Sequence, residues 1–207
     1  MSYFKNIVKL ILSQFLAPIK KLIKKRHIII FSGRNNYTYN GNSRYLFEYL
    51  STKNNLEVYW FTRSNDIKKY ITDNKMNYLS YDNPFKLIYK LLFVRIVFND
   101  GDDYFNLFKL SDSEDIYKIC LFHGYGPKTT IAALGDKIER EFRISRINKF
   151  DYVNFTSKFT AQNLAKEMFC LPDNKVKILG FPKMDAFFDL NHAHKSRLSK
   201  NKLKSLF

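Results

Sequence analysis

Short apolar runs alternate along the chain with segments in which apolar residues recur every three or four positions. The runs His27–Ser32 and Leu56–Thr62 are rich in β-branched and aromatic residues, as is typical of buried strands. Further runs predict strands over 76–81, 95–100, 116–123, 151–157 and 175–182. The stretches between them favour helices, one with Ser43 as its N-cap and one with Pro84 in its first turn.

This alternation predicts an α/β fold in which a Rossmann-like parallel sheet carries helices on both faces, spanning residues 27–188. In such sheets, ligands bind beyond the carboxyl ends of the strands. Polar or glycine-containing positions fall at four of these ends, at Asn99–Asp100, His123, Thr156–Ser157 and Gly180–Pro182.

The first 26 residues have a different pattern, with apolar residues at helical spacing, seven basic residues and no acidic residue, since the first acidic residue of the chain is Glu48. The uncharged run Leu10–Ile19 is about half the ~20 residues needed to span a bilayer, and no small-residue cleavage site follows it. We therefore expect a helix over 1–26 on an anionic membrane surface, and a peripheral protein on the cytoplasmic face of the cell membrane. The alternative is a helix that packs on the protein's own core.

Composition narrows the choice of partner. The chain has 207 residues, 45% of them hydrophobic, and a net charge of +16, which favours an anionic ligand or surface. A basic nucleic-acid-binding protein is a lesser alternative, but a nucleic-acid partner is not expected, because the sequence has no helix-turn-helix, zinc-finger or RNA-recognition pattern. The two cysteines lie far apart and His192 and His194 form only one isolated pair, so we predict no metal and no cofactor.

Candidate chemistry concentrates in the stretch CLFHGYGPKTT, which covers residues 120–130. A histidine titrates near pH 6.5, so His123 could accept a proton from a hydroxyl group. Gly124 and Gly126 allow the backbone to approach a ligand closely, and Lys128, followed by Thr129, supplies a positive charge for a phosphate. The alternative for His123 is an ordinary turn residue.

The order of three motifs resembles the CDP-glycerol glycerophosphotransferases, the teichoic acid primase and polymerase family. These motifs are FHGYGPKTT, then KFDYVNFTSKFTAQNLAKEMF, then VKILGFPKMDAF, and the resemblance covers residues 26–188. It implies one half of a GT-B fold, which pairs two Rossmann-like domains around an active-site cleft. It further implies transfer of glycerol phosphate, or a related polyol phosphate, from a CDP-activated donor to a phosphate-containing polymer of teichoic-acid or capsule type.

On this resemblance, His123 is the general base toward the acceptor hydroxyl. The substrate-binding candidates are Gly124, Gly126, Lys128, Thr129, Ser157, Lys183 and Asp185. Tyr125 and Gly126 stand where the family usually has threonine and proline, and Lys183 and Asp185 keep the charges of the family's R-N-D turn.

Residues 189–207 resemble the basic linker that leads to the family's donor-binding domain, which we expect to be a missing or separate part. The chain is then half of a split transferase or a truncated one, inactive without that domain. The alternative is a catalytically inactive, membrane-bound remnant or binding partner.

Overall fold

The computed structural model describes residues 27–33, 38–101, 116–122, 124, 137–166 and 169–188. The predicted membrane-surface helix over 1–26 and the predicted linker over 189–207 lie outside these residues. Among the described helices, none is long and apolar enough to cross a membrane.

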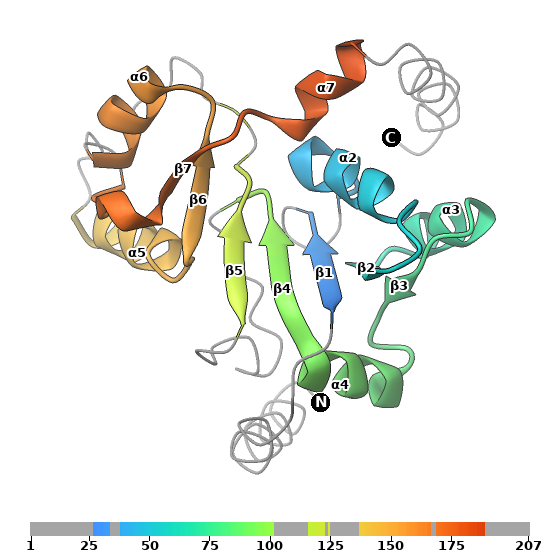
Figure 1. Ribbon diagram of the computed structural model, residues 1–207. Helices are drawn as coiled ribbons and strands as arrows, with labels where there is room; N and C mark the ends of the chain where they lie inside the picture. Colours follow the sequence, from blue (N-terminus) through green and yellow to red (C-terminus); the bar gives the residue numbers. More distant parts are fainter. Residues whose placement is uncertain are drawn as a thin grey trace.

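Seven strands form one sheet in the order β3-β2-β1-β4-β5-β6-β7, and every pair of neighbours is parallel (Figure 1). The strands are β1 (Ile28–Ser32), β2 (Glu57–Phe61), β3 (Tyr78–Leu79), β4 (Val94–Asn99), β5 (Tyr117–Cys120), β6 (Tyr152–Phe155) and β7 (Val176–Ile178). This confirms the predicted parallel α/β fold. The strand order reverses between β1 and β4, so the switch point lies beyond their carboxyl ends.

The helices are α2 (Gly41–Leu50), α3 (Asn65–Asp73), α4 (Pro84–Phe93), α5 (Lys137–Ile147), α6 (Lys158–Thr160) and α7 (Pro182–Phe188). Pro84 begins α4, as predicted, and Asn83 caps it by accepting the N–H of Lys86. The continuous helix expected after Ser157 is instead the short α6 followed by a π-helix over Ala161–Lys166, whose Ala161 and Ala165 are buried.

Alternate residues of each strand belong to opposite faces of the sheet, and helices cover both faces. Phe47 of α2 and Ile67 of α3 pack with Ile29 and Phe31 of β1 on one face. Leu87 and Leu91 of α4 pack with Ile28 and Ile30 on the other face.

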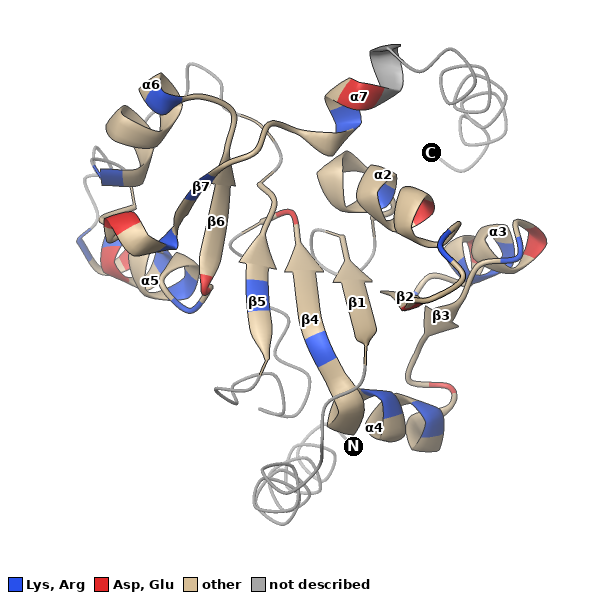
Figure 2. Cartoon of the chain, in the orientation of Figure 1, with Lys and Arg blue, Asp and Glu red and all other residues tan. Residues whose placement is uncertain are grey.

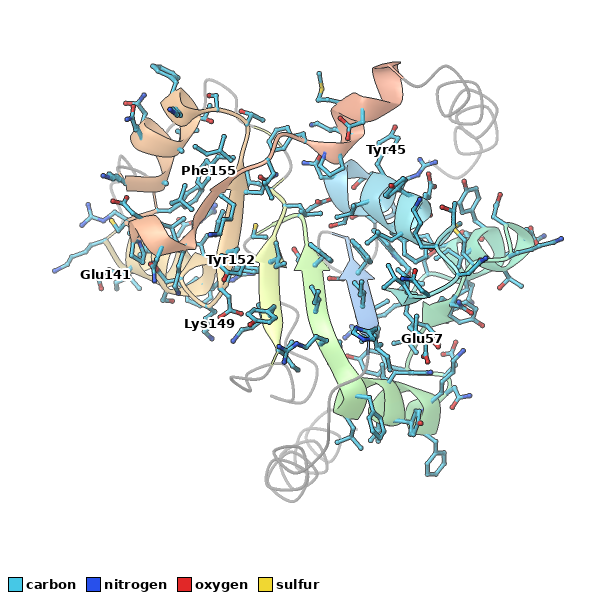
Figure 3. All side chains as sticks on the ribbon, viewed as in Figure 1. Tyr45, Glu57, Glu141, Lys149, Tyr152 and Phe155 are labelled. Atoms are coloured by element: carbon cyan, nitrogen blue, oxygen red, sulfur yellow. The ribbon has the colours of Figure 1, made fainter. Side chains whose placement is uncertain are left out.

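Helices also cover the second half of the sheet, strands β5 to β7, on the face where α4 lies. Ile147 of α5 and Ala161 pack there with Val153 and Phe155 of β6. Figure 3 labels Phe155 and, on the opposite face of β6, Tyr152, which is half-buried and stacks on Tyr117 of β5.

Several predicted element ends are wrong. The strand predicted over 175–182, for example, ends at Ile178, and Pro182 begins α7. Asn40, and not Ser43, is the N-cap residue of α2, because the helix begins three residues earlier than expected and Ser43 lies in its first turn. The strand β5 ends at Cys120, three residues before the predicted end at His123. Phe122 adopts a left-handed backbone conformation (φ 59°), which is incompatible with a continuing strand.

Candidate functional site

Three polar residues lie at the switch point, and we call Asn42, Ser43 and Asp100 the central cluster. The backbone N–H and the hydroxyl group of Ser43 donate to Oδ1 of Asp100 over 2.8 and 2.9 Å. A carboxylate is favoured at the N-terminus of a helix by the helix dipole, so Asp100 at the end of β4 attaches β4 to α2. Figure 2 draws acidic positions in red, and red colour appears in the segment just beyond the end of β4.

Gly41 makes this contact possible. A Cβ atom at Gly41 would lie 2.2 Å from Oδ2 of Asp100, and the residue has a φ of +72°, which favours glycine. The carboxyl group of Asp100 is thus enclosed between the first turn of α2 and the end of its own strand.

Enclosure changes the acidity of Asp100. Burial raises the pKa of its carboxyl group from 3.8 to about 7, against the opposing effects of the Ser43 hydrogen bonds and the positive charge of Lys183. Asp100 therefore changes its charge near neutral pH.

The Asn42 side chain is fully buried and connects three parts of the chain. Its amide nitrogen donates to the carbonyl oxygen of Phe122 over 2.5 Å, and its amide oxygen accepts the backbone N–H of Lys183 over 3.2 Å. Phe122 directly precedes His123, and Lys183 lies in the first turn of α7.

Gly124 and Lys183 lie together beyond the sheet. A Cβ atom at Gly124, whose φ is +145°, would lie 3.6 Å from Nζ of Lys183. The half-buried Lys183 thus brings an ammonium group to the backbone of the residue that follows His123.

The structure brings together two of the eight predicted site residues, Gly124 and Lys183. Ser157 instead caps α6, where its hydroxyl group accepts the N–H of Thr160 over 3.2 Å, and Asp185 lies exposed in α7. His123, Gly126, Lys128 and Thr129 lie outside the described residues.

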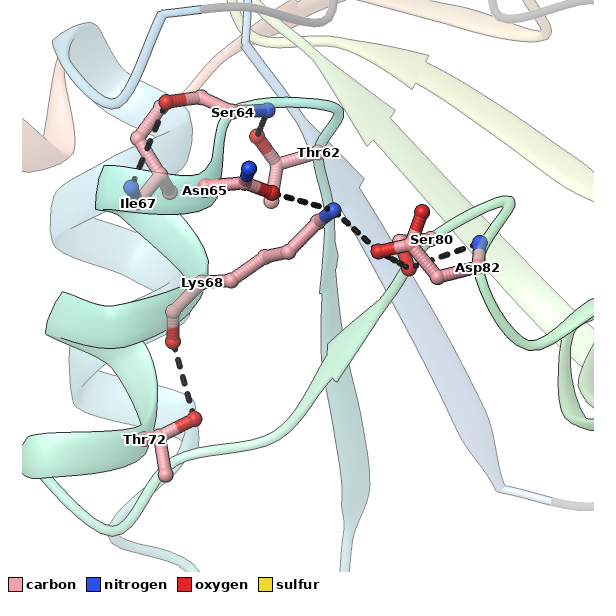
Figure 4. Close-up of polar contacts among 8 residues, drawn as sticks. All are labelled: Thr62, Ser64, Asn65, Ile67, Lys68, Thr72, Ser80 and Asp82. Atoms are coloured by element: carbon pink, nitrogen blue, oxygen red, sulfur yellow. Dashed lines mark hydrogen bonds and ion pairs between the residues drawn. The ribbon is translucent and has the colours of Figure 1, made fainter.

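A second polar network lies at the outer end of the same sheet edge, and we call Ser64, Lys68, Ser80 and Asp82 the outer cluster (Figure 4). The ammonium group of Lys68 contacts Oδ2 of Asp82 and donates to Oδ1 of Asn65 over 3.1 Å. Ser80 donates to the same carboxylate oxygen over 3.1 Å. This cluster provides hydrogen-bond and ion-pair partners for the ammonium group of the mostly buried Lys68, and it connects α3 to the end of β3.

Sequence reasoning placed Asp100 at a strand end but did not select it as a site residue, and it missed Asn42. The sequence signal for Asp100 was an acidic residue directly after an apolar strand. Within the described residues, no group of three or more His, Cys, Asp or Glu side chains could hold a metal ion.

Comparison with known proteins now identifies the family. The model of the CDP-glycerol:poly(glycerophosphate) glycerophosphotransferase family matches residues 14–203, so the chain belongs to this family. A search of curated proteins found no match.

Among solved structures, the wall teichoic acid polymerase TagF is similar to this chain, with 16% identity and a TM-score of 0.65. That match covers 94% of this chain and 49% of TagF. A TagF variant soaked with CDPG for 15 minutes gives 17% identity and a TM-score of 0.66, over 99% of this chain and 51% of that one. The chain thus has the fold of about half the length of TagF.

Proposed function

We propose that this chain acts in the transfer of a polyol phosphate, such as glycerol phosphate, from a CDP-activated donor to a teichoic-acid or capsule-type polymer. Membership of the glycerophosphotransferase family supports the reaction class. The observation that carries the site assignment is the position of the Lys183 ammonium group beside Gly124, next in sequence to His123 and beyond the carboxyl edge of the sheet.

In the proposed reaction, the acceptor hydroxyl group attacks the β-phosphorus of CDP-glycerol. A new phosphorus–oxygen bond forms, the bond between this phosphorus and the CMP oxygen breaks, and CMP leaves with the electron pair. His123 takes the proton of the attacking hydroxyl group as a general base. Lys183 pairs with a phosphate oxygen of the substrate.

The donor-binding half is assigned to a further domain, because the chain spans about half the length of TagF. We propose that closure of two domains brings the reacting atoms together, as is usual for sites built from two halves. The assay therefore supplies a donor-binding domain of the family, either fused to the chain or added to it.

The decisive test is replacement of His123 by alanine, with CMP release from CDP-glycerol as the measurement. Loss of a general base is expected to lower kcat by about 10²–10⁴-fold. His27→Ala is the matched control, because His27 is an exposed histidine at the opposite, amino end of β1. Near-equal CMP release by His123→Ala and the unchanged chain would contradict the proposal.

A further inference from the structure

Asn42 makes contacts that join the two chain segments on which the proposed reaction depends. Its side chain lies in the first turn of α2 and is fully buried. The partners of its amide are 80 residues away, at the carbonyl of Phe122, and 141 residues away, at the N–H of Lys183. One side chain therefore sets the separation between the backbone before His123 and the backbone of Lys183.

Where carboxyl groups are ionised, only an amide of this length meets both needs. The nitrogen faces the carbonyl oxygens of Leu121 and Phe122, over 3.5 and 2.5 Å, and the oxygen faces a backbone N–H. A carboxylate cannot donate to these carbonyls, and an aliphatic side chain leaves both partners unsatisfied. The partners thus fix the orientation of the amide as well as its identity.

The Phe122 backbone is in the left-handed region, which is unfavourable for a residue with a side chain and persists only where the surroundings hold it. Its ring is held by an edge contact with Phe169, with ring centroids 5.3 Å apart. Its carbonyl is held by Asn42. The direction in which the chain enters His123 therefore depends on the Asn42 amide.

A second buried asparagine, Asn154, binds the turn that precedes Lys183 in the chain. Asn154 of β6 donates to the carbonyl of Gly180 and accepts the N–H of Leu179 over 3.1 Å. These two partners are neighbours in the chain and belong to the turn after β7. Asn154 thus offers an internal control with the same chemistry, bonded to a turn that leads to Lys183.

We propose that Asn42 is the positioning residue of the site, because its amide holds the segment entering His123 and the turn carrying Lys183 in one fixed arrangement. The functional meaning of this arrangement rests on the function proposed above, whereas the arrangement itself can be tested without catalysis.

The test compares Asn42→Asp, Asn42→Leu and Asn154→Leu in the isotope-labelled full chain by NMR. The signals followed are the backbone amides of Gly124 and Lys183 and the imidazole of His123, from pH 5 to 9. A neutral aspartic acid can donate to Phe122 and accept from Lys183, so Asn42→Asp should match the unchanged chain at low pH and diverge as its carboxyl group ionises. The unchanged chain is titrated in parallel, because Asp100 and Lys183 lie close to this position.

Asn42→Leu should displace all three signals at every pH, whereas Asn154→Leu should displace Lys183, with a smaller shift of Gly124 beside its ammonium group, and leave the His123 imidazole unchanged. Retention of the original Gly124 and Lys183 signals by a folded Asn42→Leu would overturn the proposal. So would a divergence of Asn42→Asp that does not depend on pH, because the residue would then act through packing. Should Asn42→Leu fail to fold, as judged by circular dichroism, the Asn42→Asp series decides alone.

In the assay with a donor-binding domain, Asn42→Asp should lose kcat progressively as the pH rises, by up to about 10²-fold, with an unchanged KM for CDP-glycerol. This result is distinguishable from failure of the proposed function. If His123 is not the base, His123→Ala retains CMP release. The signal displacements expected for the Asn42 variants would still be observed, because they do not depend on catalysis.

Discussion

The central and outer clusters lie on the same edge of one sheet but are built from very different stretches of chain. In the outer cluster, Lys68 and Asp82 are 14 residues apart. In the central cluster, Ser43 and Asp100 are 57 residues apart. Asn42 of this cluster lies 141 residues from its hydrogen-bond partner Lys183 in α7. The outer cluster completes one local unit, whereas the central cluster forms only when three distant parts of the chain have met.

The two clusters also hold their carboxylates in opposite ways. The hydrogen bond from Lys68 is the main cause that lowers the pKa of the exposed Asp82 carboxyl group. Burial raises the pKa of Asp100 to about 7. The outer cluster thus stabilises the charged form of Asp82, whereas the central cluster disfavours the charged form of Asp100.

The largest expected effect is a difference between Asp100 and Asp82 in how their contributions to the unfolding free energy depend on pH. Because the pKa of Asp100 rises from 3.8 to about 7 on folding, its contribution to stability is present below pH 4 and is lost as the pH rises to 7. A shift of this size corresponds to about 4 kcal/mol, as an order of magnitude. Asp100→Asn removes the titration and keeps an acceptor for Ser43. Urea unfolding from pH 4 to 8 should show the variant gaining on the unchanged chain by about this amount.

The matched change in the outer cluster is Asp82→Asn, and its effect should have the opposite sign. The pKa of Asp82 is lowered, so its contribution is present above pH 4 and is lost only as the pH falls further. Parallel pH curves for Asp100→Asn and Asp82→Asn would contradict the contrast between the clusters.

The next effect in size is the difference in stability between Gly41→Ala and Gly180→Ala, with Gly41→Ala the more destabilising. Both glycines have left-handed backbone angles, so each alanine costs about 1–2 kcal/mol in strain. Only at Gly41 does the new Cβ meet another residue, at 2.2 Å from Asp100, which adds about 1–3 kcal/mol. Thermal or urea unfolding of the two variants should reveal that difference, and equal losses would argue against the tight contact.

The smallest effect tests the local nature of the outer cluster. Ser64→Ala removes the N-cap of α3, where the hydroxyl group accepts the N–H of Ile67, and should cost about 1 kcal/mol of unfolding free energy. Hydrogen exchange should increase in α3 while the amide of Ser43 stays protected. A matching loss of protection at Ser43 would show that the clusters are coupled.

The strands were predictable because a parallel sheet buries both faces, so that runs such as Ile28–Phe31 are apolar throughout. The family motifs selected Gly124 and Lys183 as candidate site residues, and the structure shows that these two lie close together, while their role stays a prediction. The contacts of Asn42 were not, because no local pattern relates residues 80 and 141 positions apart. Ser43 was misassigned because serine suits an N-cap, but here the carboxylate of Asp100 occupies that end of the helix.

The strand order also bears on how the chain folds. The interior strand β1 pairs with β2, which follows soon after it, and with β4, whose Phe98 lies opposite Phe31. During synthesis, one edge of this very apolar strand stays unpaired until about 70 further residues have been synthesised. This delay slows folding and leaves an unpaired strand edge that can aggregate. We expect the pairing of β1 with β4 to be the late, rate-limiting contact. Pulse-labelling hydrogen exchange would then show the amides of β2 protected before those of β4.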